Sequence, residues 1–472
     1  MTDLPRWRVF PPLALGTLMA TLDISVVNIA LPTIARRFGA TATTVDWVVL
    51  AYVLAITGVL LTLGRIADAV GRRRVYATGL VVFTAGSALC AAAGSLGWLV
   101  AARAVQGLGA AMMTANSTAL LVSNFPGEER GRAIGAFGAT VGVGLALGPP
   151  LGGLLVATLS WRWIFLVNLP LGVLAFVQLR RRVPADAGAG GRPDASPAGA
   201  IAWCAALVAL MLALTLGPRL GFAATPVLAL AAAGVIAVLA FAWSERRAHT
   251  PLLPLDLLRG PVGAAALLTL LSQALSLAVG IHLPMVLENV LGMGTGASGG
   301  WLAVMPVLAL FAAPLAGRIS DAIGPRVLSV VGLALTAAGF AVLAALPSRA
   351  PAVTLACGLA LVGAGLGLFT VPNSSALFGA APPERFGAAS GLQATMRNLG
   401  FTAGAALMAA AIGARYAAHA GAPLPAAGAL DRAAFVAATR EAFLGMAALA
   451  LLGVALAARR DRRGSSQAAP AG

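Results

Sequence analysis

The stretch GRIADAVGRRR at residues 64–74 recurs, with a few substitutions, as GRISDAIGPR at residues 317–326. Each copy lies between two apolar runs of about twenty residues, the length that crosses a bilayer as a helix. The copies are 317 − 64 = 253 residues apart, which indicates two related halves. Matching turns between membrane spans are typical of carriers built from duplicated helical bundles. The repeat therefore predicts a membrane carrier.

Further polar positions support the duplication. NSTAL at 116–120 pairs with NSSAL at 373–377. Three glycines of the first half recur in the second half at one constant offset, since 391 − 135, 400 − 144 and 404 − 148 all equal 256. The polar residues shared by NSTAL and NSSAL argue against chance matching of apolar sequence.

The composition indicates a membrane protein and excludes a nucleic-acid-binding protein. Hydrophobic residues make up 59% of the 472 and charged residues 10%, with a mean hydropathy of +0.91. Soluble domains contain about 25% charged residues. The net charge is +16, but the arginines lie mostly in the gaps between apolar runs and do not form one basic face.

The apolar runs predict an all-α integral membrane protein with fourteen transmembrane helices, arranged as two six-helix bundles and two central extra helices. The expected spans are 11–32, 46–64, 75–94, 98–122, 133–157, 162–179, 198–217, 224–243, 262–282, 298–317, 327–346, 352–376, 387–412 and 438–458.

The predicted organisation has four parts. Residues 1–179 form the N-terminal bundle, 180–261 a linker with the two inserted helices, 262–458 the C-terminal bundle and 459–472 a tail. Most arginines between spans fall on one side of the membrane, which predicts that both termini are cytoplasmic. We expect the first apolar run to be retained, because it lacks the small-residue site of a cleavable signal.

Four segments together resemble the major facilitator superfamily and, within it, the fourteen-span drug:proton antiporters. They are LDISVVNIALP at 22–32, GRIADAVGRRR at 64–74, RAVQGLGAA at 103–111 and GVGLALGPPLGG at 142–153. WRWIFLVNLPLG at 161–172 is also typical of that branch. The resemblance covers essentially the whole chain. It implies export of amphipathic drugs or antibiotics across the bacterial cytoplasmic membrane in exchange for protons. It also implies a monomer without cofactors, whose partners are small lipophilic substrates, protons and membrane lipids.

Asp23 and Arg103 are the candidates for proton coupling. Asp23 lies roughly 18 Å into the first span, counting 1.5 Å per residue from Pro11. A carboxylate at that depth must be neutralised, paired or hydrated. Arg103 stays charged and is its expected partner, and the resemblance assigns both positions to proton coupling. The alternative is structural, with Asp23 held by hydrogen bonds for helix packing and Arg103 pairing near the membrane surface.

Residues 64–74, called here the latch segment, carry the second group of candidates. Gly64 and Gly71 allow tight turning and close helix approach, while Asp68 suits the positive end of a helix or a nearby arginine. The resemblance implies a cytoplasmic latch that holds the outward-open state, formed by Gly64, Asp68, Gly71, Arg72 and, in the second copy, Asp321. The alternative is a basic turn that only sets topology.

The segment 142–153 carries glycines at four-residue spacing and a proline pair. Gly144, Gly148 and Gly152 allow a neighbouring helix to approach closely, and Pro149 interrupts the backbone hydrogen bonds of its helix. The resemblance associates this motif with antiporters, whereas the residues alone would also fit an ordinary packing seam. No strand precedes the glycines, so they do not predict a dinucleotide-binding loop.

The remaining polar residues within spans are candidates for a substrate cavity. These are Asn28, Gln106, Asn116, Gln273, Asn373 and Arg397. For the amides, hydrogen bonds between helices are the alternative to contacts with substrate. Arg397 has two open interpretations. It binds an anionic group of the substrate, or it pairs with Asn398 and backbone carbonyls.

Other functional classes find little support in the sequence. His249, His282 and His419 show no metal-ligand spacing, and the cysteines at 90, 204 and 357 lie inside apolar runs without a pairing pattern. We therefore expect no metal site and no enzyme activity. A dedicated exporter of a lipid, siderophore or other endogenous metabolite remains the alternative to a drug exporter.

Overall fold

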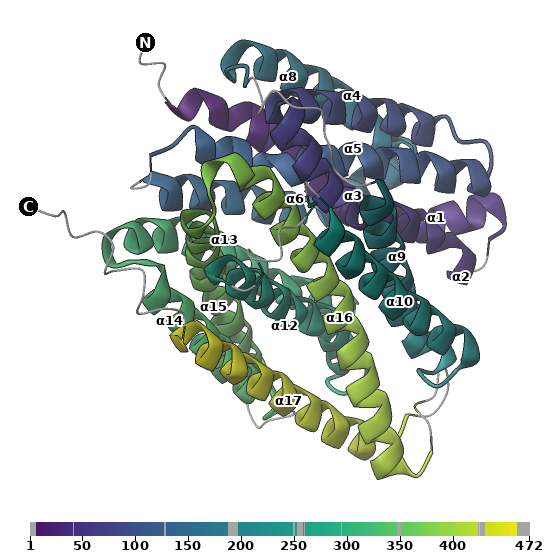
Figure 1. Cartoon of the computed structure of the whole chain (residues 1–472). Helices are drawn as coiled ribbons and strands as arrows, with labels where there is room; N and C mark the ends of the chain where they lie inside the picture. The colour runs from purple at the N-terminus through teal and green to yellow at the C-terminus, as the bar shows by residue number, and fades with distance from the viewer. Residues whose placement is uncertain are drawn as a thin grey trace, which may run out of the picture.

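A computed structural model describes residues 6–40, 42–126, 129–186, 197–248, 251–252, 258, 260–293, 295–346, 351–422, 424 and 430–459. Within these residues every regular element is a helix (Figure 1). The tail expected at 459–472 lies outside the described residues from residue 460 on.

All fourteen expected spans fall on helices. The long helices are α1 (Phe10–Phe38), α3 (Trp47–Val70), α4 (Arg72–Ala91), α5 (Leu96–Ser123), α6 (Arg130–Thr158), α8 (Asn168–Arg182), α9 (Pro197–Leu220), α10 (Thr225–Arg247), α12 (Pro261–Asn289), α13 (Thr295–Ile323), α14 (Pro325–Leu343), α15 (Pro351–Ala380), α16 (Phe386–Ala420) and α17 (Arg432–Arg459). The short elements are η1 (Arg6–Val9), α2 (Ala42–Val45), α7 (Trp163–Leu166) and η3 (Pro383–Arg385). In the described residues, 13 helical segments are long and apolar enough to cross a membrane. The 29-residue helix α6 occupies the expected span at 133–157.

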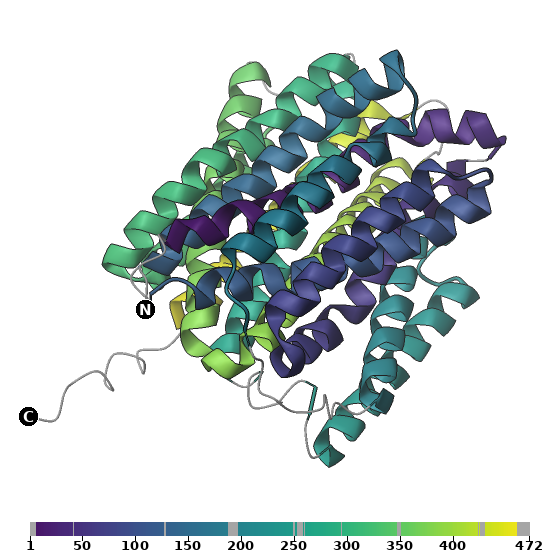
Figure 2. The same ribbon diagram turned by 90° about the horizontal axis from the view of Figure 1, so that it is seen from above.

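The helices pack as two bundles that follow the two halves of the sequence. In the first half α1 packs against α6 and α8, and α5 against α3 and α4. In the second half α15 packs against α13 and α14, and α17 against α14 and α16. Figure 1 shows the purple-to-blue first half above the green-to-yellow second half, and Figure 2 shows their helices running side by side.

Two seams join the bundles, and the repeat explains them. One lies between α3 and α16, the other between α6 and α13. A side chain at Gly64 of α3 would collide with the carbonyl of Gly387 on α16, and one at Gly317 of α13 with that of Gly131 on α6. The offsets 317 − 64 = 253 and 387 − 131 = 256 are those of the repeat. Each copy of the repeated loop therefore ends a helix that lies backbone to backbone against the other bundle.

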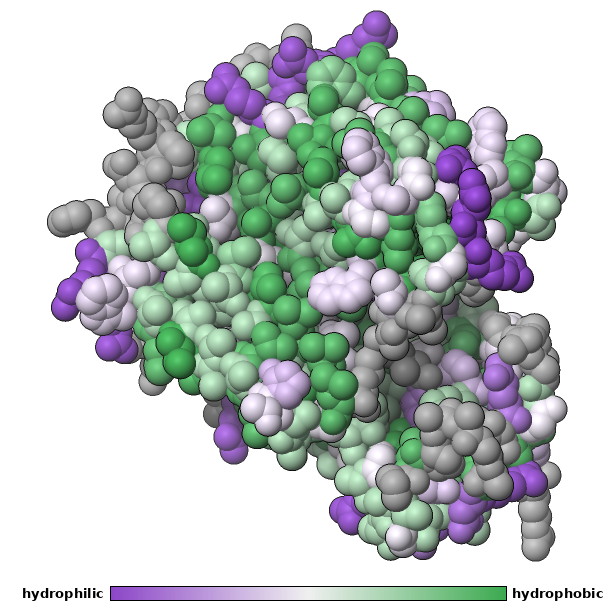
Figure 3. Space-filling model, turned by 90° about the vertical axis from the view of Figure 1, so that its right-hand side faces the viewer, coloured by the Kyte–Doolittle hydropathy of each residue, from purple (hydrophilic) through white to green (hydrophobic). Residues whose placement is uncertain are grey.

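The inserted helices α9 and α10 form a pair at the edge of the molecule. They pack against each other, and α9 also contacts α3 and α16 (Figure 1). On α10, Ile236 is 66% exposed and Leu239 64% exposed, as expected of side chains that face lipid. Figure 3 shows this side of the molecule, where hydrophobic residues cover most of the surface and hydrophilic residues lie toward its margins.

The structure changes the predicted span ends in two ways. Helix α16 has 35 residues and α17 starts at Arg432, so both extend beyond the predicted ranges 387–412 and 438–458. Hydropathy detects only the apolar part of a helix, whereas alanine-rich polar sequence continues the same backbone hydrogen bonding. The expected span at 162–179 is divided into α7 and α8 at Val167.

Candidate functional site

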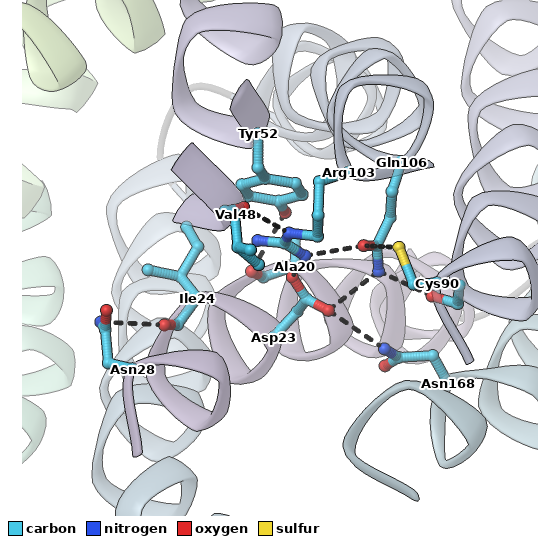
Figure 4. A network of polar contacts seen from close by, with 11 residues as sticks. Ala20, Asp23, Ile24, Asn28, Val48, Tyr52, Cys90, Arg103, Gln106 and Asn168 are labelled. Atoms are coloured by element: carbon cyan, nitrogen blue, oxygen red, sulfur yellow. Dashed lines mark hydrogen bonds and ion pairs between the residues drawn. The ribbon is translucent and has the colours of Figure 1, made fainter. Parts of the chain in front are cut away.

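A buried ion pair joins α1 and α5 within the N-terminal bundle (Figure 4). The Nη1 atom of Arg103 lies 2.5 Å from Oδ2 of Asp23, and both residues are fully buried at 0% exposure. The expected partnership of these two residues is present in the structure. The opposite charges compensate each other, which is the condition for keeping either one inside a membrane.

Arg103 is held by three further groups. Its Nε donates to the carbonyl oxygen of Val48 at 3.0 Å, and its Nη1 to Oε1 of Gln106 at 2.7 Å. The guanidinium carbon lies 4.0 Å from the centre of the Tyr52 ring, a cation–π arrangement. Its Nη2 atom has no hydrogen-bond partner among the described residues. The side chain is thus fixed by α3 as well as by α1.

The second carboxylate oxygen of Asp23 accepts from two amides. Gln106 donates from Nε2 at 2.8 Å and Asn168 from Nδ2 at 3.4 Å. Gln106 also donates to the hydroxyl of Ser87 at 2.7 Å and accepts from the thiol of Cys90 at 3.5 Å. Gln106, predicted for the substrate cavity, therefore lies inside this network, where it links α1, α4 and α5.

Sequence reasoning singled out neither Asn168 nor Tyr52 for this network. Asn168 is the first residue of α8, directly after the break at Val167, and the break directs its side chain toward Asp23. A signal existed, because Asn168 is the only amide within the quoted segment WRWIFLVNLPLG. Tyr52 reads in the sequence as an ordinary apolar position of its span.

The latch segment contacts the opposite bundle through Asp68. Its carboxylate accepts from the backbone amides of Gly387 at 2.9 Å and Ala388 at 3.0 Å, in the first turn of α16. Arg72 pairs with the same carboxylate at 2.9 Å and donates to the carbonyl of Pro383 at 2.7 Å. A negative charge at a helix N-terminus is stabilising. Asp68 thus joins the two bundles at this end.

A residue beyond the N-terminal bundle supports the latch segment. Asp186 accepts from the backbone amides of Arg72 at 2.5 Å and Arg73 at 3.0 Å, so it caps α4 from a distant part of the chain. Gly71 has φ of 106°, a conformation that side-chain-bearing residues rarely adopt. The side chain of Asp321, the candidate in the second copy, lies outside the described part of the structure.

The glycines of the segment 142–153 face α1. An added Cβ at Gly144 would meet Thr21, one at Gly148 would meet Ser25, and one at Gly152 would meet Val26 at 3.0 Å. These three contacts lie on either side of Asp23 along α1. The glycines therefore set the position of the helix that carries the buried carboxylate. The side chain of Pro149 lies outside the described part of the structure.

Three of the amide side chains predicted for the substrate cavity donate hydrogen bonds to other groups of the protein, which fits the alternative of a structural role. Asn28 is exposed, donates to the carbonyl of Ile24 on its own helix and lies apart from the network (Figure 4). Asn116 is buried and donates to the carbonyl of Met112. Asn373 on α15 donates to the Ala265 carbonyl and the Thr269 hydroxyl on α12, each at 2.9 Å.

The other two predicted cavity residues, Gln273 on α12 and Arg397 on α16, are partly exposed. Asn398, one of the partners considered for Arg397, donates its side-chain amide to the hydroxyl of Thr57 on α3 at 3.1 Å. The two residues therefore remain candidates for contact with a substrate.

No group of three metal-binding side chains occurs in the part of the chain that the structure describes. His282 contacts the Thr439 hydroxyl at 3.1 Å, and His419 contacts Glu441 at 2.9 Å. His249 lies outside the described residues.

Comparison with known proteins identifies relatives along the whole chain. The family model described as Major Facilitator Superfamily matches residues 13–405 and 299–472. The chain is 35% identical to the uncharacterized transporter YebQ of Escherichia coli K12, over 86% of this chain and 88% of that protein. It is also 35% identical to the multidrug resistance protein Stp of Mycobacterium tuberculosis CDC 1551, over 84% of this chain and 73% of Stp.

A solved structure agrees with the fold. The crystal structure of the human organic anion transporter MFSD10 superposes with a TM-score of 0.70, covering 96% of this chain and 99% of that chain. The sequence identity is 16%, so this likeness concerns the fold alone.

Proposed function

Because the chain belongs to the major facilitator superfamily, we propose that it exports amphipathic drugs or antibiotics across the bacterial cytoplasmic membrane in exchange for protons. The superfamily membership makes it a multi-pass membrane transporter and not an enzyme. The name of its relative Stp supports drugs as the substrate class. In this proposal both termini are cytoplasmic, and the latch segment lies on the cytoplasmic side.

The buried Asp23–Arg103 pair is the observation that carries the proposal of proton coupling. Protonation of Asp23 would remove the negative charge that compensates Arg103. Breaking a buried pair in this way costs about 3–5 kcal/mol when the surroundings do not change. The protein would avoid that cost by moving α1, α5 and α8 relative to one another, since these helices supply Asp23, Arg103 and Asn168.

The contacts of Asp68 support an alternating cycle. They hold α3 of one bundle to the first turn of α16 in the other, so this end of the molecule is joined. Carriers with this architecture rock one bundle against the other around a site between them. In our proposal the latch contacts form in the outward-facing state and separate when the cytoplasmic side opens.

The proton gradient supplies enough energy for this transport. One charge crossing 100 mV contributes about 2.3 kcal/mol, which corresponds to a roughly fifty-fold substrate gradient for one proton per substrate. No bound cofactor is needed in the proposed cycle.

The proposal is tested by dye accumulation in an efflux-deficient bacterial host. Wild type and Asp23→Asn are compared at equal membrane expression, with and without a protonophore, and Glu441→Gln serves as a charge-matched control on the surface. We expect low accumulation only in wild type and the control, and its loss on adding the protonophore. If Asp23→Asn still concentrates dye outside against a gradient, proton coupling through Asp23 is wrong. Equal accumulation in all strains would contradict broad drug export and favour a dedicated metabolite exporter.

A further inference from the structure

Arg397 places a positive charge deep inside the C-terminal bundle. It lies 397 − 386 = 11 residues after the start of α16, which is roughly 17 Å along the helix. Asp23 lies at a similar depth on α1, 23 − 10 = 13 residues after its start. A charge at such a depth needs a partner or water. Asp23 has its partner in Arg103, so the question is what compensates Arg397.

The contacts of the residues next to Arg397 on α16 show which helices this face of α16 is directed toward. The next residue, Asn398, contacts α3 through Thr57. Gly400 lies against Leu270 and Gln273 of α12. At 100° per residue, Arg397 lies between these two directions. It therefore faces the interior between α3 of one bundle and α12 of the other.

The opposite face of α16 confirms this orientation. Leu399 and Ala403, about 200° and 240° around the helix from Arg397, line an apolar cavity beside the inserted pair α9 and α10. The lipid-side cavity and Arg397 are thus on different sides of the same helix. Arg397 itself is partly exposed, so part of the residue is accessible to a small molecule.

Arg397 makes no hydrogen bond or ion pair with any other residue that the structure describes. Arg103 shows what this chain does with a buried guanidinium that it neutralises itself, because there a carboxylate, an amide, a carbonyl and an aromatic ring surround it. Among the described residues, none of these groups makes a hydrogen bond, ion pair or cation–π contact with Arg397. The difference between the two arginines indicates that a group from outside the chain completes the Arg397 site.

The sequence supplies no carboxylate for Arg397 from its own half. The acidic residues of the C-terminal bundle are Glu288, Asp321, Glu384 and Asp431, which lie at or near helix ends, and Glu441, which lies 441 − 432 = 9 residues into α17. Glu441 is bound by Arg415 and His419, and Asp23 in the other half is bound by Arg103. An uncompensated positive charge therefore remains at this depth.

Gln273 offers a second hydrogen-bond donor next to Arg397. Its Cβ lies 3.0 Å from the position that a Cβ on Gly400 would take, so it stands directly against α16. Gly400 is three residues from Arg397, about one helical turn. Gln273 is partly exposed and makes no hydrogen bond within the described residues. A guanidinium on α16 and an amide on the adjacent helix α12, about one turn away along α16, suit the two oxygens of a carboxylate.

We infer that Arg397, assisted by Gln273, binds a carboxylate or similar monoanionic oxyacid group of the transported molecule. The substrates are then amphipathic monoanions or zwitterions with an anionic group, in place of purely cationic lipophiles. The inference rests on the proposed function in one respect, since it takes the interior between the bundles as the transport path. A bidentate guanidinium–carboxylate pair gives both the charge compensation and the geometric selection.

The inference is tested by binding to the purified full-length protein in lipid nanodiscs, without a proton gradient. The probes are 7-diethylaminocoumarin-3-carboxylate and its uncharged carboxamide, which have nearly the same size and shape. Wild type should bind the carboxylate roughly 10- to 100-fold more tightly than the carboxamide. Arg397→Gln should remove this preference and leave carboxamide affinity unchanged, whereas Arg397→Lys should retain part of it. Arg415→Gln, which removes a surface charge from the same helix, should behave as wild type.

The opposite results overturn the inference. They are a wild-type protein that binds the carboxylate no more tightly than the carboxamide, or an Arg397→Gln variant that keeps the preference. If Arg397→Gln does not fold, Gln273→Glu takes its place, because it brings a resident carboxylate next to Arg397 and should abolish the preference for the anionic probe. Asp23→Asn should keep the preference for the carboxylate while losing uphill export, so a failure of proton coupling and a failure of anion recognition give different results.

Discussion

The carboxylate of Asp68 on α3 accepts a hydrogen bond of 3.0 Å from the backbone amide of Ala388, the third residue of α16 in the opposite bundle. The first amides of a helix have no partner within the helix. Asp68 supplies that partner from another part of the fold, so a side chain in the last turn of α3 caps the first turn of α16. The bundles cannot separate at this end without leaving these amides and the carboxylate to water.

Asp68→Asn should weaken this junction. The variant keeps the shape of the side chain but loses the charge that strengthens its hydrogen bonds and pairs with Arg72, a loss of about 1.5–3 kcal/mol. We expect the open population at this end to rise roughly tenfold or more. The measurement is the labelling rate of Ala389→Cys, a fully buried position of α16, by a maleimide in a background without native cysteines. An unchanged rate would show that Asp68 does not hold the junction closed.

Asp186→Ala should loosen the latch segment from outside the bundle. It removes the acceptor for the amides of Arg72 and Arg73, and loss of a helix cap costs about 1 kcal/mol. Asp431→Ala is a matched control, since Asp431 caps α17 through the amides of Ala433 and Ala434. Both variants should lower the melting temperature slightly. Only Asp186→Ala should speed labelling of the Ala389→Cys reporter, and equal labelling in the two variants would contradict a role in the latch.

Gly64→Ala should force α3 away from α16. Its new Cβ would collide with the backbone carbonyl of Gly387, which cannot rotate aside as a side chain would. Gly413→Ala on α16 is the control, because nothing lies within 4 Å of its added Cβ. Alanine favours a helix over glycine by about 0.5–1 kcal/mol, so the control should be slightly stabilised. Gly64→Ala should be destabilised despite that gain, as measured by thermal unfolding in detergent. A stability equal to the control would show that α3 and α16 do not need this approach.

Asp23→Asn should destabilise the protein as well as uncouple it. The substitution leaves Arg103 buried without its counter-charge, at a cost of about 3–5 kcal/mol. The double variant Asp23→Asn with Arg103→Gln removes both charges and should recover most of the lost stability without recovering uphill export. Thermal unfolding and transport by the same preparations separate the two effects. Recovery of export in the double variant would mean that the pair has only a structural role.

The sequence predicted the helices and the central ion pair because both depend on features that are rare in such a chain. Long apolar runs separated by arginine-containing gaps leave few alternatives to membrane-spanning helices. Asp23 and Arg103 are deep opposite charges in one half, and pairing is the least costly arrangement for them. The end of α16 and the start of α17 were predicted too short, since arginine, tyrosine and histidine lower the hydropathy of these segments while their alanines continue the helix.

The sequence could not show which partner Asp68 selects or that Asp186 belongs to the latch. Both carboxylates accept hydrogen bonds from backbone amides. Every residue except proline carries such an amide, so the sequence does not show which residue is the partner. Asn168 was missed for another reason. It joins the network because the helix breaks at Val167, and the sequence analysis did not use the signal for that break: the ring of Pro170 would clash with the carbonyl of Leu166 in a continuous helix.

The position of the inserted pair has a mechanical consequence. Helix α9 contacts α3 of one bundle and α16 of the other, so it spans the seam between them. In the proposed cycle the bundles rock against each other, and α9 would then exchange its contacts with one of these two helices at every turnover. The inserted pair would thereby affect the rate of the cycle, and we expect substitutions where α9 meets α3 or α16 to change the turnover rate.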